Sequence, residues 1–141
     1  MPINHQVEWQ EAYSVGSALM DNHHKELVRM TNELFRGCER NEDVFPFLRT
    51  IQNAVNYAKT HFSVEERIMQ KINYPEYSLH KAEHESFVLE LLKQMNNFEQ
   101  GKCTSLDFAL FLKNWLLNHI AVTDKKYSPF FKNIKEEEFT S

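Results

Sequence analysis

The chain has 141 residues and a mass of 16.8 kDa, and its 16 lysines and arginines against 20 aspartates and glutamates give a formal net charge of −4. This length fits one domain, residues 1–141, that can bury a core without a disulfide or a structural metal. The slightly acidic balance and the absence of a long basic cluster argue against a nucleic acid or a membrane surface as partner. With only 3 glycines and 4 prolines, the chain has too few turn residues for a β-sandwich or barrel and is predicted to be mostly helical.

The first residues, MPINHQVEW, contain no apolar run typical of a signal peptide, and the most apolar stretch of the chain is interrupted by Asp107 and Lys113. The sequence therefore predicts a cytoplasmic protein without a membrane span. Its 2 cysteines, Cys38 and Cys103, lack a CxxC spacing and are expected to be free thiols, although an antiparallel bundle could place them at the same end.

Four segments have apolar residues at every third or fourth position, which is typical of amphipathic helices that face one core. The predicted helices cover approximately residues 17–38, 44–71, 75–99 and 104–127. Residues 1–16 contain Trp9 and Tyr13, so this segment is predicted to be an arm that packs across the helices. Because short connections place consecutive helices antiparallel, the sequence predicts an all-α, up-down-up-down antiparallel four-helix bundle.

Polar side chains fall on the apolar sides of these helices. The second helix places His61 and Glu65 in phase with its apolar residues. The third helix does the same with His80 and His84, and the fourth with His119. A single inward histidine is more often a hydrogen-bonded core residue than a ligand. Imidazoles from all four helices together with an unpaired carboxylate would leave an unsatisfied core unless they bind a cation, so the pattern predicts a metal site inside the bundle.

Helix periodicity does not decide two of the candidate ligands. In the first helix, a rotation of about 100° per residue places His24 slightly closer than His23 to the apolar side, and this preference disappears when two further apolar residues are counted as core. In the fourth helix, Asp124 lies five residues after His119. Five residues advance an α-helix by about 140° beyond a full turn, so the two side chains do not share one side. Asp124 is equally well explained as a solvated acid beside two lysines.

The number and type of these ligands narrow the choice of metal. Five histidines with one or two carboxylates exceed the four ligands of a tetrahedral zinc, and two cysteines are too few for an iron–sulfur cluster. Imidazoles with bridging carboxylates suit iron, copper or zinc, and this set can hold two octahedral ions with one position left open. Two iron ions are the best fit.

Five groups of residues resemble the motifs of the bacteriohemerythrins, the bacterial relatives of hemerythrin and myohemerythrin, over nearly the whole chain. These groups are Trp9-x3-Tyr13-x2-Gly16, Asp21-x2-His24-x2-Leu27, His61-Phe62-x2-Glu65-Glu66-x2-Met69, Tyr74-Pro75-x4-His80-x3-His84-x2-Phe87 and Trp115-Leu116-x2-His119-Ile120-x3-Asp124.

The resemblance implies a ligand for each position of a non-haem diiron site. His80, His84 and His119 match the residues that hold one iron. His24 and His61 match those that hold the second iron, which selects His24 over His23 and leaves His23 as a surface neighbour. Glu65 and Asp124 match the two carboxylates that, with a hydroxo or oxo group, bridge the irons.

The resemblance also implies a function. Dioxygen is expected to bind reversibly, as a peroxo species at the iron held by two histidines, for oxygen storage, delivery or scavenging, without catalytic residues. Leu27, Phe62 and Leu116 are expected to line the oxygen pocket and to exclude water from it. An oxygen or redox sensor whose arm responds to the irons is the alternative. A diiron enzyme acting on nitric oxide or peroxide ranks last, because the Glu-x-x-His pairs of ferritin-type oxidases are absent from this ligand set. The sequence does not identify a protein partner.

Overall fold

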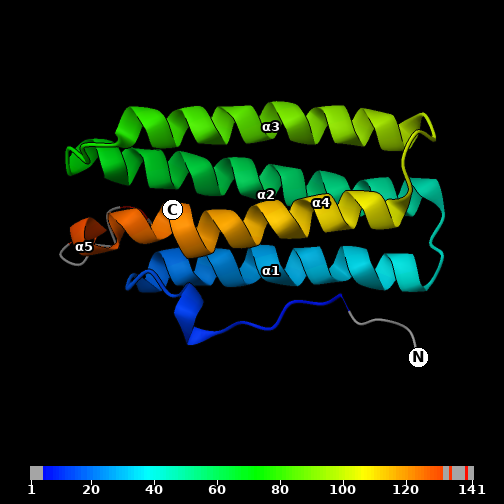
Figure 1. The fold of residues 1–141 in the computed structure, drawn as a ribbon, viewed down its shortest axis with the longest axis horizontal. Coiled ribbons are helices and arrows are strands. Elements are labelled where there is room, and N and C mark those ends of the chain that lie inside the picture. Colours follow the sequence, from blue (N-terminus) through cyan, green and yellow to red (C-terminus); the bar gives the residue numbers. More distant parts are fainter. Residues whose placement is uncertain (1–4, 132–133, 135–138, 140–141) are drawn as a thin grey trace.

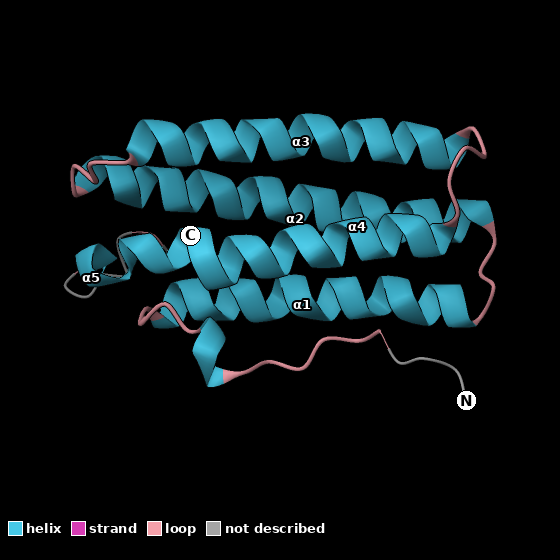
Figure 2. Cartoon of the chain, in the orientation of Figure 1, coloured by secondary structure: helices cyan, strands magenta, loops and turns pink. Residues whose placement is uncertain are grey.

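The structure is a computed structural model that describes residues 5–131, 134 and 139. Its four long helices are α1 (Ala18–Glu39), α2 (Val44–Lys71), α3 (Tyr77–Glu99) and α4 (Ser105–Asn118). Successive helices run in opposite directions, and α1 and α3 each pack beside both α2 and α4 (Figure 1). The described residues form helices and loops without a strand (Figure 2). The predicted all-α antiparallel four-helix bundle is therefore confirmed.

Side-chain caps at the N-termini of α1 and α4 help to set where these helices begin. The Ser17 hydroxyl accepts a hydrogen bond from the backbone N–H of Met20 at the start of α1. At the start of α4, Thr104 and Asp107 form a capping box, in which each side chain accepts a hydrogen bond from the backbone N–H of the other residue. Among the described residues, no helix is long and apolar enough to cross a bilayer.

The end of the fourth helical segment differs from the predicted single helix up to about residue 127. α4 ends at Asn118, and the chain continues through a π-helical turn, η2 (His119–Thr123), a 3-10 turn, η3 (Asp124–Tyr127), and a short helix, α5 (Ser128–Phe131). The backbone N–H of Asp124 donates to the carbonyl oxygen of His119, five residues earlier. A bond between residues five apart is the mark of a π-helical turn, which accommodates one residue more than an α-helical turn.

The N-terminal arm packs against two helices of the bundle. In α1, the Asn32 side chain accepts a hydrogen bond from the N–H of Val7 at 2.7 Å and donates one to its carbonyl oxygen at 2.9 Å. In α4, the Lys113 ammonium donates to the carbonyl oxygen of His5 at 2.8 Å. The arm ends in the 3-10 turn η1 (Glu11–Tyr13) and at Gly16, whose φ of +78° favours glycine where the chain turns into α1.

The core consists of two apolar clusters along the bundle. The larger cluster fills the end at which α1 meets α2 and α3 meets α4, and the smaller one fills the opposite end, with Met20, Ile68, Met69, Tyr127 and Phe131 among its members. In α1, His24 lies between Met20 of the smaller cluster and Leu27 of the larger one, and in α3, His80 and His84 lie between Tyr77, which packs on the smaller cluster, and Phe87 of the larger one. Cys38 and Cys103 are both free thiols, as expected.

Candidate metal centre

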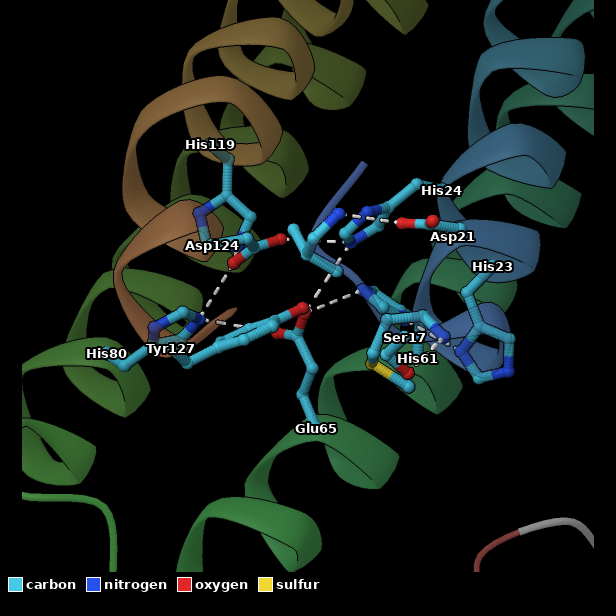
Figure 3. Close-up of polar contacts among 12 residues, drawn as sticks. Ser17, Asp21, His23, His24, His61, Glu65, His80, His119, Asp124 and Tyr127 are labelled. Atoms are coloured by element: carbon cyan, nitrogen blue, oxygen red, sulfur yellow. Dashed lines mark hydrogen bonds and ion pairs between the residues drawn. The ribbon is translucent and has the colours of Figure 1, made fainter. Parts of the chain in front are cut away.

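Seven polar side chains meet between the two apolar clusters, and six of them are drawn with labels in Figure 3. They are His24 of α1, His61 and Glu65 of α2, His80 and His84 of α3, and His119 and Asp124 of the segment after α4. Each is buried, with at most 4% of its surface exposed. The structure thus brings together every residue that was predicted as a metal ligand.

The two carboxylates divide the five imidazoles into two sets. One Glu65 oxygen, Oε1, lies 3.3 Å from His80 Nε2 and 3.1 Å from His84 Nε2. The other, Oε2, lies 3.1 Å from His61 Nε2 and 3.6 Å from His24 Nε2. Each oxygen of Glu65 therefore faces a different set of histidines.

The two carboxylate oxygens of Asp124 also face different sets of histidines. Its Oδ1 lies 3.1 Å from His80 Nε2 and 2.9 Å from His119 Nε2, whereas its Oδ2 lies 2.9 Å from His24 Nε2. The result is a three-histidine position, made by His80, His84 and His119, and a two-histidine position, made by His24 and His61. Both carboxylates contribute one oxygen to each position, which is the arrangement of a bridging ligand.

Several of the short distances in the centre join buried atoms that lack a hydrogen-bond partner of good geometry. Although nitrogen and oxygen atoms lie about 3 Å apart, seven buried atoms have no hydrogen-bond partner among the described residues. These atoms are His24 Nδ1 and Nε2, His61 Nε2, His80 Nε2, Glu65 Oε1 and both carboxylate oxygens of Asp124. Buried polar atoms without partners are costly in a folded protein. Metal ions between the two sets would satisfy all of them except His24 Nδ1, so the donor set fits metal binding.

The π-helical turn explains why Asp124 reaches the centre. In an uninterrupted α-helix, Asp124 would point about 140° away from His119. Because the N–H of Asp124 bonds to the carbonyl oxygen of His119, roughly one full turn separates the two residues, and both side chains face inward. Helical periodicity could not reveal this residue, since the expected direction of its side chain assumes a regular α-helix.

Charged residues outside the centre contact two histidines of the three-histidine position. Glu66 Oε2 lies 2.9 Å from Nδ1 of His84, and Glu83 Oε1 lies 3.3 Å from Nδ1 of His119. The hydroxyl of Thr123, within the π-helical turn, also donates to Glu83 Oε1 at 3.0 Å. These acids orient the imidazoles, a role that the sequence analysis missed because both appear as solvated residues beside the inward-facing positions.

His23 is not the surface neighbour that was expected. It is half-buried, and its Nδ1 lies 2.8 Å from Nδ1 of His61, at the right of Figure 3. Burial and the nearby imidazole of His61 lower the pKa of His23 to about 4, so this ring is neutral at pH 7. Its position one residue before His24 was the available signal, since a side chain at that position flanks the inward-facing side of α1.

Tyr127 is a further residue that the sequence analysis did not assign to the site. Its hydroxyl donates a 2.7 Å hydrogen bond to Oε2 of Glu65, and the side chain is fully buried. Burial and the carboxylates of Asp124 and Glu65 raise the pKa of Tyr127 well above its ordinary value, so the phenol remains a donor at neutral pH.

Burial and charge oppose each other in the centre. Burial lowers the pKa of His24 and His80, but contacts with Asp124 and Glu65 outweigh it and raise both pKa values to about 9. Burial likewise lowers the pKa of His119, and Asp124 raises it to about 10. Burial raises the pKa of the two carboxyl groups, but the surrounding imidazoles hold both below their ordinary range. Without metal, the centre therefore holds protons on imidazoles beside ionised carboxylates.

An apolar cavity of about 20 Å³ lies beside the centre. Leu27, Phe62 and Leu116, the predicted pocket residues, all line it. Leu27 is one turn from His24 along α1, and Ala58, which also lines the cavity, is one turn from His61 along α2. Phe87 and Leu116, which also line it, lie one turn from His84 and His119, so the cavity adjoins both metal positions, and its walls contain almost no polar surface.

Comparison with known proteins assigns the family. The model of the Hemerythrin family, described as "Hemerythrin HHE cation binding domain", matches residues 15–131. The bacteriohemerythrin of Methylococcus capsulatus is 30% identical over 126 residues, which cover 86% of this chain and 93% of that protein. The bacteriohemerythrin of Stenotrophomonas maltophilia is 28% identical over 120 residues, which cover 85% and 78% respectively.

A solved structure agrees with these sequence relatives. The crystal structure of wild-type hemerythrin superposes with a TM-score of 0.80 at 28% identity, covering 89% of this chain and 98% of that one. With a family match over most of the chain and the same bundle in a solved relative, the resemblance found in the motifs is confirmed, and this chain belongs to the hemerythrin family.

Proposed function

We propose that this protein binds dioxygen reversibly at a non-haem diiron centre, for oxygen storage, delivery or scavenging. The observation that supports the proposal best is the division of the two carboxylates, each of which presents one oxygen to a three-histidine set and the other to a two-histidine set. Two metal positions with unequal numbers of histidines leave the two-histidine position with an open place for a ligand. Membership of the hemerythrin family favours iron as the metal.

His80, His84 and His119 would hold one iron, His24 and His61 would hold the other, and Glu65 and Asp124 would bridge them. When bound there, two ferrous ions would supply the two electrons that reversible binding of dioxygen requires. The protein contributes neutral imidazoles, orients them through outer partners such as Glu66 and Glu83, and donates a hydrogen bond from Tyr127 to the bridging carboxylate of Glu65.

The apolar cavity provides the conditions for binding without turnover. It adjoins the metal centre, and its lining residues Leu27, Phe62 and Leu116 offer no proton to a bound ligand. Exclusion of water and of proton donors disfavours the loss of oxygen in a reduced, protonated form. The site therefore fits a binding protein better than an enzyme.

The test is an optical titration of reduced, iron-loaded protein. The proposal predicts two irons per chain and an absorption band in the visible region that appears on exposure to oxygen and disappears when oxygen is removed, over repeated cycles. Substoichiometric iron under iron-replete conditions, or irreversible oxidation in the first cycle, would contradict it. Steady consumption of oxygen with a reductant would instead indicate an enzyme.

A redox sensor is the second candidate, and contacts of the arm support it. The carboxylate of Asp21, one turn before His24, accepts hydrogen bonds from the Ser14 hydroxyl at 2.6 Å and from the Val15 N–H at 2.9 Å. The Ser128 hydroxyl, one turn after Asp124, donates to the carbonyl oxygen of Val15 at 2.6 Å. The arm is thus bonded to both segments that hold the centre. Hydrogen exchange of the arm amides should differ between oxidised and reduced protein if the arm responds to the irons, and equal exchange would exclude this role.

A further inference from the structure

The outer contacts of the imidazoles differ in charge between the two metal positions. At the three-histidine position, Nδ1 of His84 and Nδ1 of His119 each lie beside a carboxylate, Glu66 or Glu83. At the two-histidine position, Nδ1 of His61 lies beside the imidazole of His23, at 2.8 Å. Nδ1 of His24 has no hydrogen-bond partner among the described residues. The three-histidine position is therefore backed by two anionic groups, whereas in the part of the chain that the structure describes no anionic side chain contacts the outer nitrogens of the two-histidine position.

Proton counting assigns the direction of the bond between His23 and His61. Two Nδ1 atoms at 2.8 Å must share one proton, because two protonated or two unprotonated nitrogens would repel each other. His61 directs its Nε2 towards the centre, so a bound metal leaves its proton on Nδ1. His61 is then the donor and His23 is the acceptor. His23 consequently carries its own proton on Nε2.

We propose that His23 is a positioning residue for the two-histidine metal position. It fixes the tautomer and the orientation of His61, as a carboxylate would, but without adding negative charge. A carboxylate that accepts from an imidazole increases the basicity of this ligand, and a neutral acceptor does so less. The two positions therefore bind metal with unequal strength, and the weaker one is the position with the open place. This inference rests on the two-metal site of the proposed function.

The role is tested by titrating metal-free protein with Zn²⁺, which involves neither oxygen nor redox chemistry. Wild-type protein should bind two ions in two steps of different affinity. His23→Leu removes the acceptor and should weaken the second step by about 10- to 100-fold while leaving the first unchanged. Asn22→Leu, at an exposed neighbouring position, is the matched control and should leave both steps unchanged.

Two further substitutions separate the geometry of His23 from its charge. In His23→Asn and His23→Asp, a side-chain oxygen takes the place of Nδ1, neutral in the first variant and anionic in the second. The Asn variant should stay within a few-fold of wild type, and the Asp variant should bind the second ion more tightly than the Asn variant. In zinc-loaded wild-type protein, the ¹⁵N spectrum of His23 should show the neutral tautomer protonated on Nε2.

The outcomes distinguish this inference from the proposed function. Two zinc ions in every variant, with identical binding steps, would overturn the role of His23 and leave the two-metal site intact. Equal affinities of the Asn and Asp variants would overturn the effect of charge. Binding of fewer than two ions by wild-type protein would overturn both the inference and the site on which it rests.

Discussion

Glu65 is the most constrained side chain of the centre because four imidazoles and one phenol surround its two oxygens. Its contacts with His24, His61, His80 and His84 come from three different helices. Tyr127 adds a hydrogen bond to Oε2, which holds the carboxylate plane in one orientation. An orientation fixed in this way allows each oxygen to serve one metal position.

Replacing Tyr127 by phenylalanine should therefore weaken both the fold and the metal site. The loss of a buried donor to a carboxylate is expected to cost about 1–3 kcal/mol of the free energy of unfolding, measured by urea denaturation of metal-free protein. Metal affinity should also fall, because the carboxylate loses a contact that orients it.

Tyr74→Phe is the matched control for this substitution. The Tyr74 hydroxyl donates a longer hydrogen bond, of 3.4 Å, to the exposed Glu76, so its loss should change the free energy of unfolding by less than about 0.5 kcal/mol. If the two variants unfold at the same urea concentration, the hydrogen bond to Glu65 does not contribute as argued.

At the scale of elements, the π-helical turn determines whether the fourth helical segment supplies one ligand or two. Residues five apart face the same side only in this turn, whereas in an α-helix residues four apart do so, within about 40°. The Thr123 hydroxyl and His119 both contact Glu83 of α3, which ties the turn to the neighbouring helix. The turn can therefore be tested by changing the number of residues between His119 and Asp124.

Deletion of Val122 should preserve the site, and insertion of one alanine before Val122 should abolish it. Val122 is exposed, so neither change removes a core residue. Deletion places the aspartate four residues after His119, where an ordinary α-helix again points both side chains inward. Insertion places it six residues away, about 240° around an α-helix, and points it out of the core.

Metal content per chain and helical circular dichroism measure the outcome. The deletion variant should keep two metal ions, and the insertion variant should keep its helical signal but lose metal. Val122→Ala, which preserves the chain length, serves as the control and should match wild type. Loss of metal in the deletion variant together with retention in the insertion variant would refute this account of the turn.

The bundle and most of the centre could be predicted from the sequence because both follow from the α-helical period. His61, Glu65, His80 and His84 lie inside long regular helices, where each position has a defined direction. The α-helical period did not predict that Asp124 faces inward, because the π-helical turn changes the rotation per residue. It also missed His23, Glu66 and Glu83, since these side chains lie at the border between the buried and exposed sides and their role depends on contacts with another helix.

At the scale of the whole molecule, the centre lies between two apolar clusters, and metal binding is coupled to folding. All four helical segments contribute to the centre, so a metal that binds only the folded chain should stabilise the whole bundle. Removal of metal leaves ionised carboxylates and protonated imidazoles in the same buried space. The stability of the metal-free protein must then depend on the protonation of these imidazoles.

The direction of this dependence follows from the pKa values. The pKa of His24 and His80 is raised from 6.5 to about 9, and that of His119 to about 10. A group whose pKa is raised in the folded state contributes its full stability below the unfolded value and loses it as the pH rises through the folded value. Metal-free protein should therefore melt at progressively lower temperature between pH 6.5 and pH 10.

The stabilisation that metal binding adds should change with pH in the opposite direction. Metal binding displaces the protons of His24, His80 and His119, so metal affinity increases with pH until these imidazoles are neutral in the metal-free protein. The difference in melting temperature between zinc-loaded and metal-free protein should consequently widen from pH 6.5 to pH 9, as measured by calorimetry at constant zinc concentration. Zinc binding near pH 7 should release about three protons per chain, detected in buffers of different ionisation enthalpy. A constant difference in melting temperature and no proton release would mean that these imidazoles are already neutral without metal, and the charge balance inferred for the centre would be wrong.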